Sequence, residues 1–126
     1  MRPDNYRYTE SHEWVCVEGD TALVGITDFA VQELTDLIFV DLPAPGTKVK
    51  KGEPFGEIES VKTVAELYAP VSGEIIEVHS ELAENIEILS ESPFEKGWMI
   101  KIKLDDPSEI EALLTKEAYD ELVANH

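Results

Sequence analysis

The sequence contains little cysteine, little histidine and no long apolar run, and each shortage excludes a class of function. Cys16 is the only cysteine, which excludes an internal disulfide and most cysteine-ligated zinc sites. The three histidines, His12, His79 and His126, are not at metal-ligand spacing. No apolar run approaches the roughly 18 residues of a membrane span, and we see no secretory leader. We therefore expect no metal site and a cytoplasmic protein, or a mitochondrial matrix protein if the chain is a processed eukaryotic form.

Familiar catalytic motifs are also missing. The chain has no Gly-x-x-x-x-Gly-Lys-Ser/Thr loop to hold a phosphate and no Gly-x-Ser-x-Gly elbow to present a nucleophile. Acidic pairs are common, but in a chain with 27 acidic residues such a pair carries little information about catalysis. We expect a protein without catalytic machinery of its own.

Positive charge is scarce. Ten basic residues oppose 27 acidic ones, which gives a net charge of −17. Binding of nucleic acid through its phosphates is excluded, and an anionic membrane surface is disfavoured for the same reason. Such a surface repels copies of itself and is attracted to basic clefts on partner proteins. We therefore expect a monomer that visits its partners briefly.

Short apolar segments separated by turn residues predict a mainly β protein. The last strand, for example, alternates polar and apolar residues. A short helix over 29–34 begins after a cap at Thr27 or Asp28, and 80–92 reads as an acidic loop. Apolar residues at helical spacing from Ile110 onward, including Leu113 and Leu114, predict a helical tail. The expected strands are 6–17, with His12 inside it, 21–26, 37–42, two segments flanking Lys62, 74–78 and 98–104.

Lys62 is the most informative residue. Strand-like residues lie on both sides of it, and Pro70 and Gly73 close the segment. A lysine at the apex of a tight hairpin exposes its amine to water, where a modifying enzyme can reach it. Surface lysines are common, so the surrounding sequence must support this reading.

That surrounding sequence resembles the H proteins of the glycine cleavage system, a family of lipoyl-bearing carriers. The order and spacing of the shared pieces hold over about residues 6–124. The glutamate–serine–valine–lysine run ending at Lys62, followed eleven residues later by Gly73, is highly specific in combination. The matching segments are 11–14 (SHEW), 24–28 (VGITD), 39–43 (FVDLP), 56–62 (GEIESVK), 69–75 (APVSGEI) and 97–102 (GWMIKI).

The resemblance implies a fold and a cofactor. The fold is a lipoyl-domain-like sandwich of two small antiparallel sheets, a barrel-sandwich hybrid, with a short internal helix and C-terminal helices. It implies one carrier domain over 1–126, with a core of about 6–104 and a helical tail over 105–126. It also implies that lipoate is joined to Lys62 by an amide bond, and that Glu59 and Gly73 help lipoate-attaching enzymes to find this lysine.

The resemblance further implies partners and a resting place for the lipoyl arm. The decarboxylating P protein loads the arm with an aminomethyl group. The T protein passes the one-carbon unit to tetrahydrofolate and releases ammonia, and the flavin-dependent L protein reoxidises the arm. Between these visits the loaded arm folds back into a cleft near Ser11, Glu13 and Glu66, where a carboxylate such as Glu13 holds the amine as an ammonium. We expect that cleft to be half-exposed.

Three other kinds of protein could carry a lysine in such a hairpin. A biotin carrier has methionine on both sides of its lysine, whereas Val61 and Thr63 stand here. A lipoyl domain of a 2-oxoacid dehydrogenase usually has Asp-Lys-Ala, is shorter, and lacks the 11–14 segment and the helical tail. The remaining alternative is a lipoate relay or storage protein that donates lipoyl groups to other enzymes, and Lys62 does not exclude it.

Overall fold

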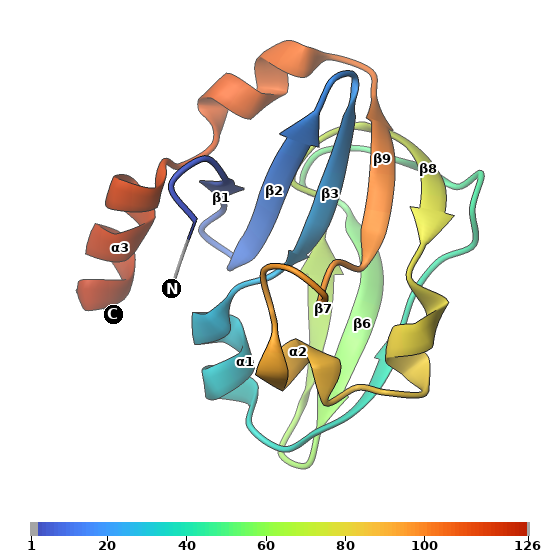
Figure 1. The fold of residues 1–126 in the computed structure, drawn as a ribbon, viewed down its shortest axis with the longest axis vertical. Coiled ribbons are helices and arrows are strands. Elements are labelled where there is room, and N and C mark those ends of the chain that lie inside the picture. The colour runs from blue at the N-terminus through green and yellow to red at the C-terminus, as the bar shows by residue number, and fades with distance from the viewer. Residues whose placement is uncertain (1–2, 126) are drawn as a thin grey trace.

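The computed structural model describes residues 3–125, and its architecture is two antiparallel sheets packed face to face (Figure 1). This confirms the expected mainly β, lipoyl-domain-like sandwich. The larger sheet has the strand order β1–β2–β3–β9–β8–β5, and the smaller has the order β4–β6–β7. The strands are β1 (Arg7–Tyr8), β2 (Glu13–Glu18), β3 (Thr21–Ile26), β4 (Leu37–Asp41), β5 (Lys48–Val49), β6 (Pro54–Ser60), β7 (Val64–Tyr68), β8 (Gly73–Val78) and β9 (Ile100–Leu104).

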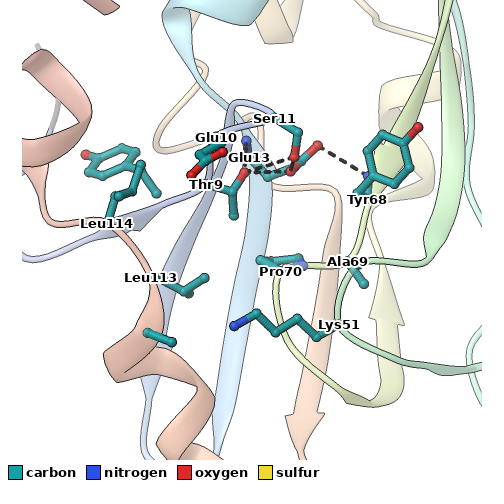
Figure 2. Close-up of a pocket in the computed structure, with 13 residues that line it drawn as sticks. Thr9, Glu10, Ser11, Glu13, Lys51, Tyr68, Ala69, Pro70, Leu113 and Leu114 are labelled. Carbon is teal, nitrogen blue, oxygen red and sulfur yellow. Dashed lines mark hydrogen bonds between the residues drawn. The ribbon is translucent and has the colours of Figure 1, made fainter. Parts of the chain in front are cut away.

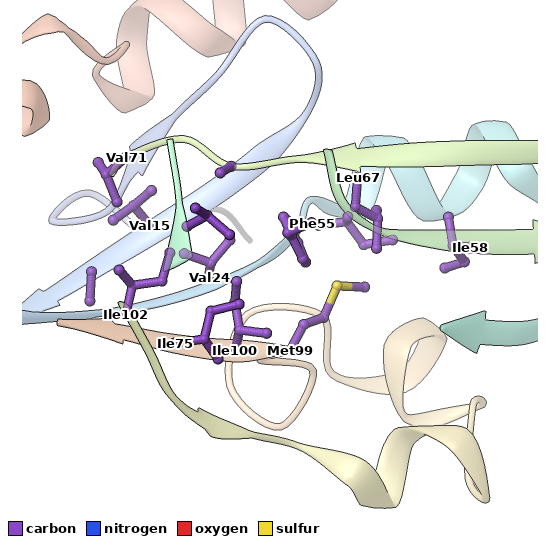
Figure 3. Packing of buried hydrophobic residues seen from close by; sticks show 14 of the residues in the cluster. Val15, Val24, Phe55, Ile58, Leu67, Val71, Ile75, Met99, Ile100 and Ile102 are labelled. Carbon is purple, nitrogen blue, oxygen red and sulfur yellow. The ribbon is translucent and has the colours of Figure 1, made fainter. Parts of the chain in front are cut away.

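The core lies between the inner faces of the two sheets (Figure 3). Alternation of buried and exposed residues fixes which face of each strand points inward, because successive side chains of a strand point to opposite faces. In β9, Ile100 and Ile102 are fully buried and pair with the inward-facing residues of β3 and β8. In the smaller sheet, Val40 and Ile58 are paired across strands and are buried together. The register is therefore set by burial of one face of each sheet.

Short helices close the ends of the sandwich, with bounds α1 (Asp28–Leu34), η1 (Ser80–Ala83), α2 (Ile88–Glu91), η2 (Pro107–Ala112) and α3 (Lys116–Ala124). The expected short helix is confirmed as α1, and Thr27 is its cap, because its side chain accepts a hydrogen bond from the Ala30 amide. The prediction of a loop over 80–92 is wrong. Two helical turns form there because they place Leu82 and Leu89 in the core, both fully buried.

Two further expectations are corrected by the structure. Residues 6–17 are two strands, not one, because the chain reverses at residues 9–12 so that β1 pairs with β2. His12 therefore lies in a bend, with a positive φ of 72°, and not in a strand. The last strand begins at Ile100, two residues later than expected. In the tail, Leu113 and Leu114 leave the helical pattern, and Leu114 exchanges backbone hydrogen bonds with Tyr8.

No helix among residues 3–125 has both the length and the apolar character that a membrane crossing requires.

Candidate functional site

Lys62 lies at the tip of the β6–β7 hairpin, as expected, and its side chain is exposed. Ser60 fixes the turn beneath it. The Ser60 hydroxyl accepts hydrogen bonds from the backbone N–H groups of Lys62 and Thr63, both at 3.2 Å, and the Ser60 N–H donates to the Thr63 carbonyl at 2.8 Å. The Val61 N–H also donates to the Asp36 carbonyl at 3.1 Å, which ties the tip to the segment before β4. The backbone of the tip is thus held while the lysine amine projects into solvent.

Apolar and acidic side chains surround this tip on the outer face of the smaller sheet. Phe39, Glu59 and Val64 form one row across β4, β6 and β7. Phe39 is 50% exposed and Val64 is 53% exposed, so the row presents apolar surface on both sides of Glu59. Val61, beside Lys62, is 68% exposed. Glu59 is half-buried in this row, close to the lysine, and an approaching protein can contact its exposed part.

A row of carboxylates lies next to this apolar row. Asp41, Glu57 and Glu66 are paired across the same three strands, two residues further from the tip. Like charges that face one another across strands destabilise a sheet. The negative charge of the Glu66 carboxylate also raises the pKa of the Tyr68 phenol, two residues along the same strand. This face is therefore strongly negative.

Glu13 is the one buried carboxylate near this face, at 1% exposure, although we expected a half-exposed cleft. Its Oε1 accepts hydrogen bonds from the hydroxyls of Thr9 at 2.7 Å and Ser11 at 2.5 Å, and its Oε2 accepts one from the Tyr68 N–H at 3.2 Å (Figure 2). Burial raises the pKa of the Glu13 carboxyl, and the hydrogen bonds oppose that rise. The carboxylate is thus held in one orientation by three donors.

A cavity of about 150 Å³ brings together the three residues expected to line the cleft, Ser11, Glu13 and Glu66. Its remaining lining is largely apolar and includes Ile26, Leu34 and Ile58. We call it the Glu13 cavity. Sequence analysis did not identify the contribution of α1 to its wall, because nothing in the sequence shows that this helix packs beside β7.

The Glu13 cavity lies within reach of a long arm attached to Lys62. Glu66 is four residues beyond Lys62 on the same hairpin, which is about 13 Å along a strand. A second cavity of about 370 Å³ lies on the other side of the contact between Glu13 and Tyr68, at the far end of β7, and Ser11 and Glu13 line both cavities. Figure 2 shows this second cavity, with Lys51 and Pro70 in its wall. Because Tyr68 is about 20 Å along the strand from Lys62, the Glu13 cavity is the nearer of the two.

Gly73 lies in the larger sheet, whereas Glu59 lies in the smaller one. A Cβ atom at Gly73 would come within 2.1 Å of the Lys103 carbonyl oxygen and 2.6 Å of a methyl group of Ile102. Close approach of β8 to β9 therefore requires glycine at this position. Its suggested part in recognition of the lysine stays a prediction, but packing alone is a sufficient reason for the residue.

Comparisons with known proteins agree with the fold and the hairpin. The profile of the family described as Glycine cleavage H-protein matches residues 6–126. A glycine cleavage system H protein from Geobacillus sp. (strain WCH70) is 56% identical over 121 residues, which is 96% of this chain and 95% of that protein. One from Halalkalibacterium halodurans is 52% identical over 122 residues, 97% of this chain and 95% of that protein.

A solved structure gives the same result. The crystal structure of a glycine cleavage system H protein from Mycobacterium marinum is similar with a TM-score of 0.89 and 36% identity. The match covers 98% of this chain and 99% of that one. Profile, full-length identity and fold agree, and the chain belongs to the glycine cleavage H-protein family.

Proposed function

We propose that this chain is the lipoyl-bearing carrier of the glycine cleavage system and that lipoate is attached to the amine of Lys62. The observation that carries the proposal is the position of Lys62, exposed at the tip of a hairpin whose backbone is held by Ser60 and Asp36. An amine that must enter the active site of an attaching enzyme has to project from the protein on a turn that keeps its shape. Family membership supports the same role.

The residues present fit a lipoyl group. Its carbon chain is apolar, and the Glu13 cavity offers apolar side chains such as Ile26 and Ile58 within reach of Lys62. The carboxylates of Glu13 and Glu66 lie in the same lining and suit a positively charged head group. When attached, lipoate would supply a disulfide ring that can accept an aminomethyl group on one sulfur together with a pair of electrons.

The contribution of the chain is to tether, orient and shelter this group, without catalysis of its own. Tethering raises the effective concentration of the arm at each partner, so each encounter can stay weak. The partners are the P, T and L proteins and the enzymes that attach lipoate. Ser11 and Thr9 hold the Glu13 carboxylate in one orientation, and Glu13 lines the cavity, where its carboxylate can hold an ammonium group. Glu59 presents a charge beside Lys62 for recognition by the attaching enzyme.

The relay alternative, in which the protein mainly donates lipoyl groups to other enzymes, is not favoured. The relatives from Geobacillus sp. and Halalkalibacterium halodurans, each matched over nearly the whole chain, are glycine cleavage system H proteins. The function proposed here accounts for the Glu13 cavity, whereas a donor of lipoyl groups has no need to shelter an amine.

Site-specific attachment tests the proposal. The apo protein, incubated with lipoate, ATP and a lipoate ligase, should gain one lipoyl group, and peptide mapping should place it on Lys62. The physical reason is that Lys62 alone projects from a braced strand-to-strand hairpin. Lys51, which is also exposed and lies in a turn, is the matched control. A label on Lys51, or persistent labelling of a Lys62→Arg variant, would contradict the proposal.

A further inference from the structure

We infer that Tyr119, on the C-terminal helix α3, is a positioning residue for the Glu13 cavity and acts through His12 and Thr27. The inference rests on the proposed function, because the shape of this cavity matters only if the cavity receives the lipoyl arm. Helix α3 lies beside β1, outside the two sheets (Figure 1). Tyr119 is a fully buried side chain of this helix that contacts residues around the cavity.

The hydroxyl of Tyr119 joins three segments that are far apart in the sequence. Tyr119 is fully buried. Its oxygen lies 2.8 Å from Nδ1 of His12 and 2.7 Å from Oγ1 of Thr27, which is also fully buried. A buried hydroxyl with two partners at these distances fixes their relative positions, because loss of either hydrogen bond would leave a polar atom unsatisfied away from water.

Both partners of Tyr119 belong to the frame of the Glu13 cavity. His12 lies between Ser11 and Glu13 in the sequence and lines the cavity itself. Thr27 is the cap of α1: its Oγ1 accepts a hydrogen bond from the N–H of Ala30, which also lines the cavity. The Thr27 N–H donates to the His12 carbonyl at 3.0 Å. Tyr119 thus links the bend at Ser11 and His12, which precedes Glu13, to α1, which contributes Ala30 to the lining.

One tautomer of His12 gives these hydrogen bonds a consistent direction. Each hydroxyl has one proton. With His12 neutral and protonated on Nε2, the Thr27 hydroxyl donates to Tyr119 and the Tyr119 hydroxyl donates to Nδ1 of His12. Both hydroxyl protons then have an acceptor, and Oγ1 of Thr27 still accepts the N–H that caps α1.

The backbone of His12 shows why such fastening is needed. Its φ of 72° lies in the left-handed region, which residues with a Cβ rarely adopt. Conformations of this kind persist only where the surroundings hold them. Here the His12 N–H donates to the Thr9 carbonyl at 3.1 Å, its carbonyl accepts from Thr27, and its ring is held by Tyr119 and lies 4.9 Å from the ring of Phe29. Removal of the Tyr119 hydroxyl should therefore loosen the segment that carries Ser11 and Glu13.

A pair of matched variants tests the inference in the apo protein. Tyr119→Phe removes the hydroxyl and keeps the ring, which stacks on Tyr8 at 4.9 Å. Tyr8→Phe is the control, because Tyr8 is equally buried but its hydroxyl donates to the Pro3 carbonyl, away from the cavity. Hydrogen exchange at the amides of Thr27 and Ala30 should quicken in Tyr119→Phe by at least about fivefold, the size expected for loss of one of its two hydrogen bonds, and stay unchanged in Tyr8→Phe.

The second readout uses the lipoylated carrier loaded with the amine-bearing group, without the T protein. Mass spectrometry should show that Tyr119→Phe releases formaldehyde and ammonia about fivefold faster than the wild type, whereas Tyr8→Phe keeps the wild-type rate. Lipoylation of Lys62 should be unchanged in both variants, because the hairpin tip is held by Ser60 and not by α3.

A conservative replacement separates positioning from general damage to the fold. In His12→Asn, Oδ1 takes the place of Nδ1 as an acceptor, and asparagine tolerates positive φ. This variant should keep the wild-type exchange rates at Thr27 and Ala30, whereas His12→Leu should quicken them. Equal rates in Tyr119→Phe and the wild type, or equal acceleration in Tyr8→Phe, would overturn the inference. Glu13→Gln distinguishes this failure from a failure of the proposed function: if it also leaves the release rate unchanged, the cavity does not shelter the arm.

Discussion

At the scale of single residues, Glu13 is the most unusual feature of this protein. In a chain with 27 acidic residues it is a carboxylate at 1% exposure, and its three hydrogen-bond donors come from Thr9, Ser11 and Tyr68. Burial of a carboxylate is costly even when donors surround it, and the raised pKa of Glu13 reflects that cost. The chain tolerates a destabilising charge at the place where the proposed function needs one.

The pH dependence of stability should reveal this cost. A carboxyl whose pKa is higher in the folded than in the unfolded state binds its proton more tightly when folded. Its contribution to stability is complete below its unfolded pKa and is lost as the pH rises through its folded pKa. The free energy of unfolding of the wild type, relative to Glu13→Gln, should therefore increase as the pH falls from 7 toward 4.5.

Chemical denaturation at several pH values measures this difference, and Glu59→Gln is the control, because Glu59 lies in the outer row beside Phe39 and Val64. A difference between the wild type and Glu13→Gln that is constant from pH 7 to 4.5 would contradict the assignment of a raised pKa to Glu13.

At the scale of elements, the two sheets differ in which residues they expose and which they bury. The smaller sheet carries Lys62 at its tip and the row of Asp41, Glu57 and Glu66 on its outer face. Charges paired in this way weaken a sheet by a few tenths of a kcal/mol or more per pair. The larger sheet contributes more buried core residues than the smaller one, and its strands β8 and β9 approach closely at Gly73. The smaller sheet presents its charges on its outer face, where partners can contact them.

Gly73→Ala should destabilise the fold strongly. The added methyl group would meet the Lys103 carbonyl, and backbone cannot move aside as a flexible side chain can. Overpacking of this kind costs typically about 1–3 kcal/mol, and we expect the upper part of that range. Thermal or chemical denaturation measures the loss, with Glu74→Gln, an exposed neighbour in the same strand, as the control. If Gly73→Ala had wild-type stability but resisted lipoylation, recognition and not packing would explain the glycine.

At the scale of the whole molecule, the net charge of −17 is the dominant property. It opposes self-association, so a monomer remains the prediction, as do a single carrier domain and a cytoplasmic location. An excess of one charge also raises the rate at which a protein meets partners of opposite charge. For a carrier that must visit several enzymes in turn, rapid and weak association is useful.

Association with the P and T proteins should therefore weaken as salt is added. Exposed charges more than about 10 Å apart are largely screened at 0.1 M ionic strength, so the association rate should fall between low and moderate salt. Stopped-flow measurements with the lipoylated carrier test this, with free lipoamide as the control for effects of salt on the enzyme itself. A rate that does not change with salt would indicate that the contacts are chiefly apolar.

The sequence by itself determined the class of fold, the hairpin and its lysine. Alternation of polar and apolar residues, turn residues and a helix cap are local signals. They correctly predicted β3, α1 and the turn that holds Lys62. Family resemblance also identified Ser11, Glu13 and Glu66 as neighbours, and the structure brings them to one cavity.

Only the tertiary structure decided the rest. Residues 80–92 form helical turns because these turns bury Leu82 and Leu89 in the core. No local sequence pattern predicts this burial. His12 adopts a positive φ because Thr27 and Tyr119, distant in sequence, hold it. Burial of Glu13 likewise depends on β7, since the Tyr68 N–H binds its carboxylate. In each case the deciding contact joins residues far apart along the chain, and a sequence pattern carries no information on such contacts until the chain has folded.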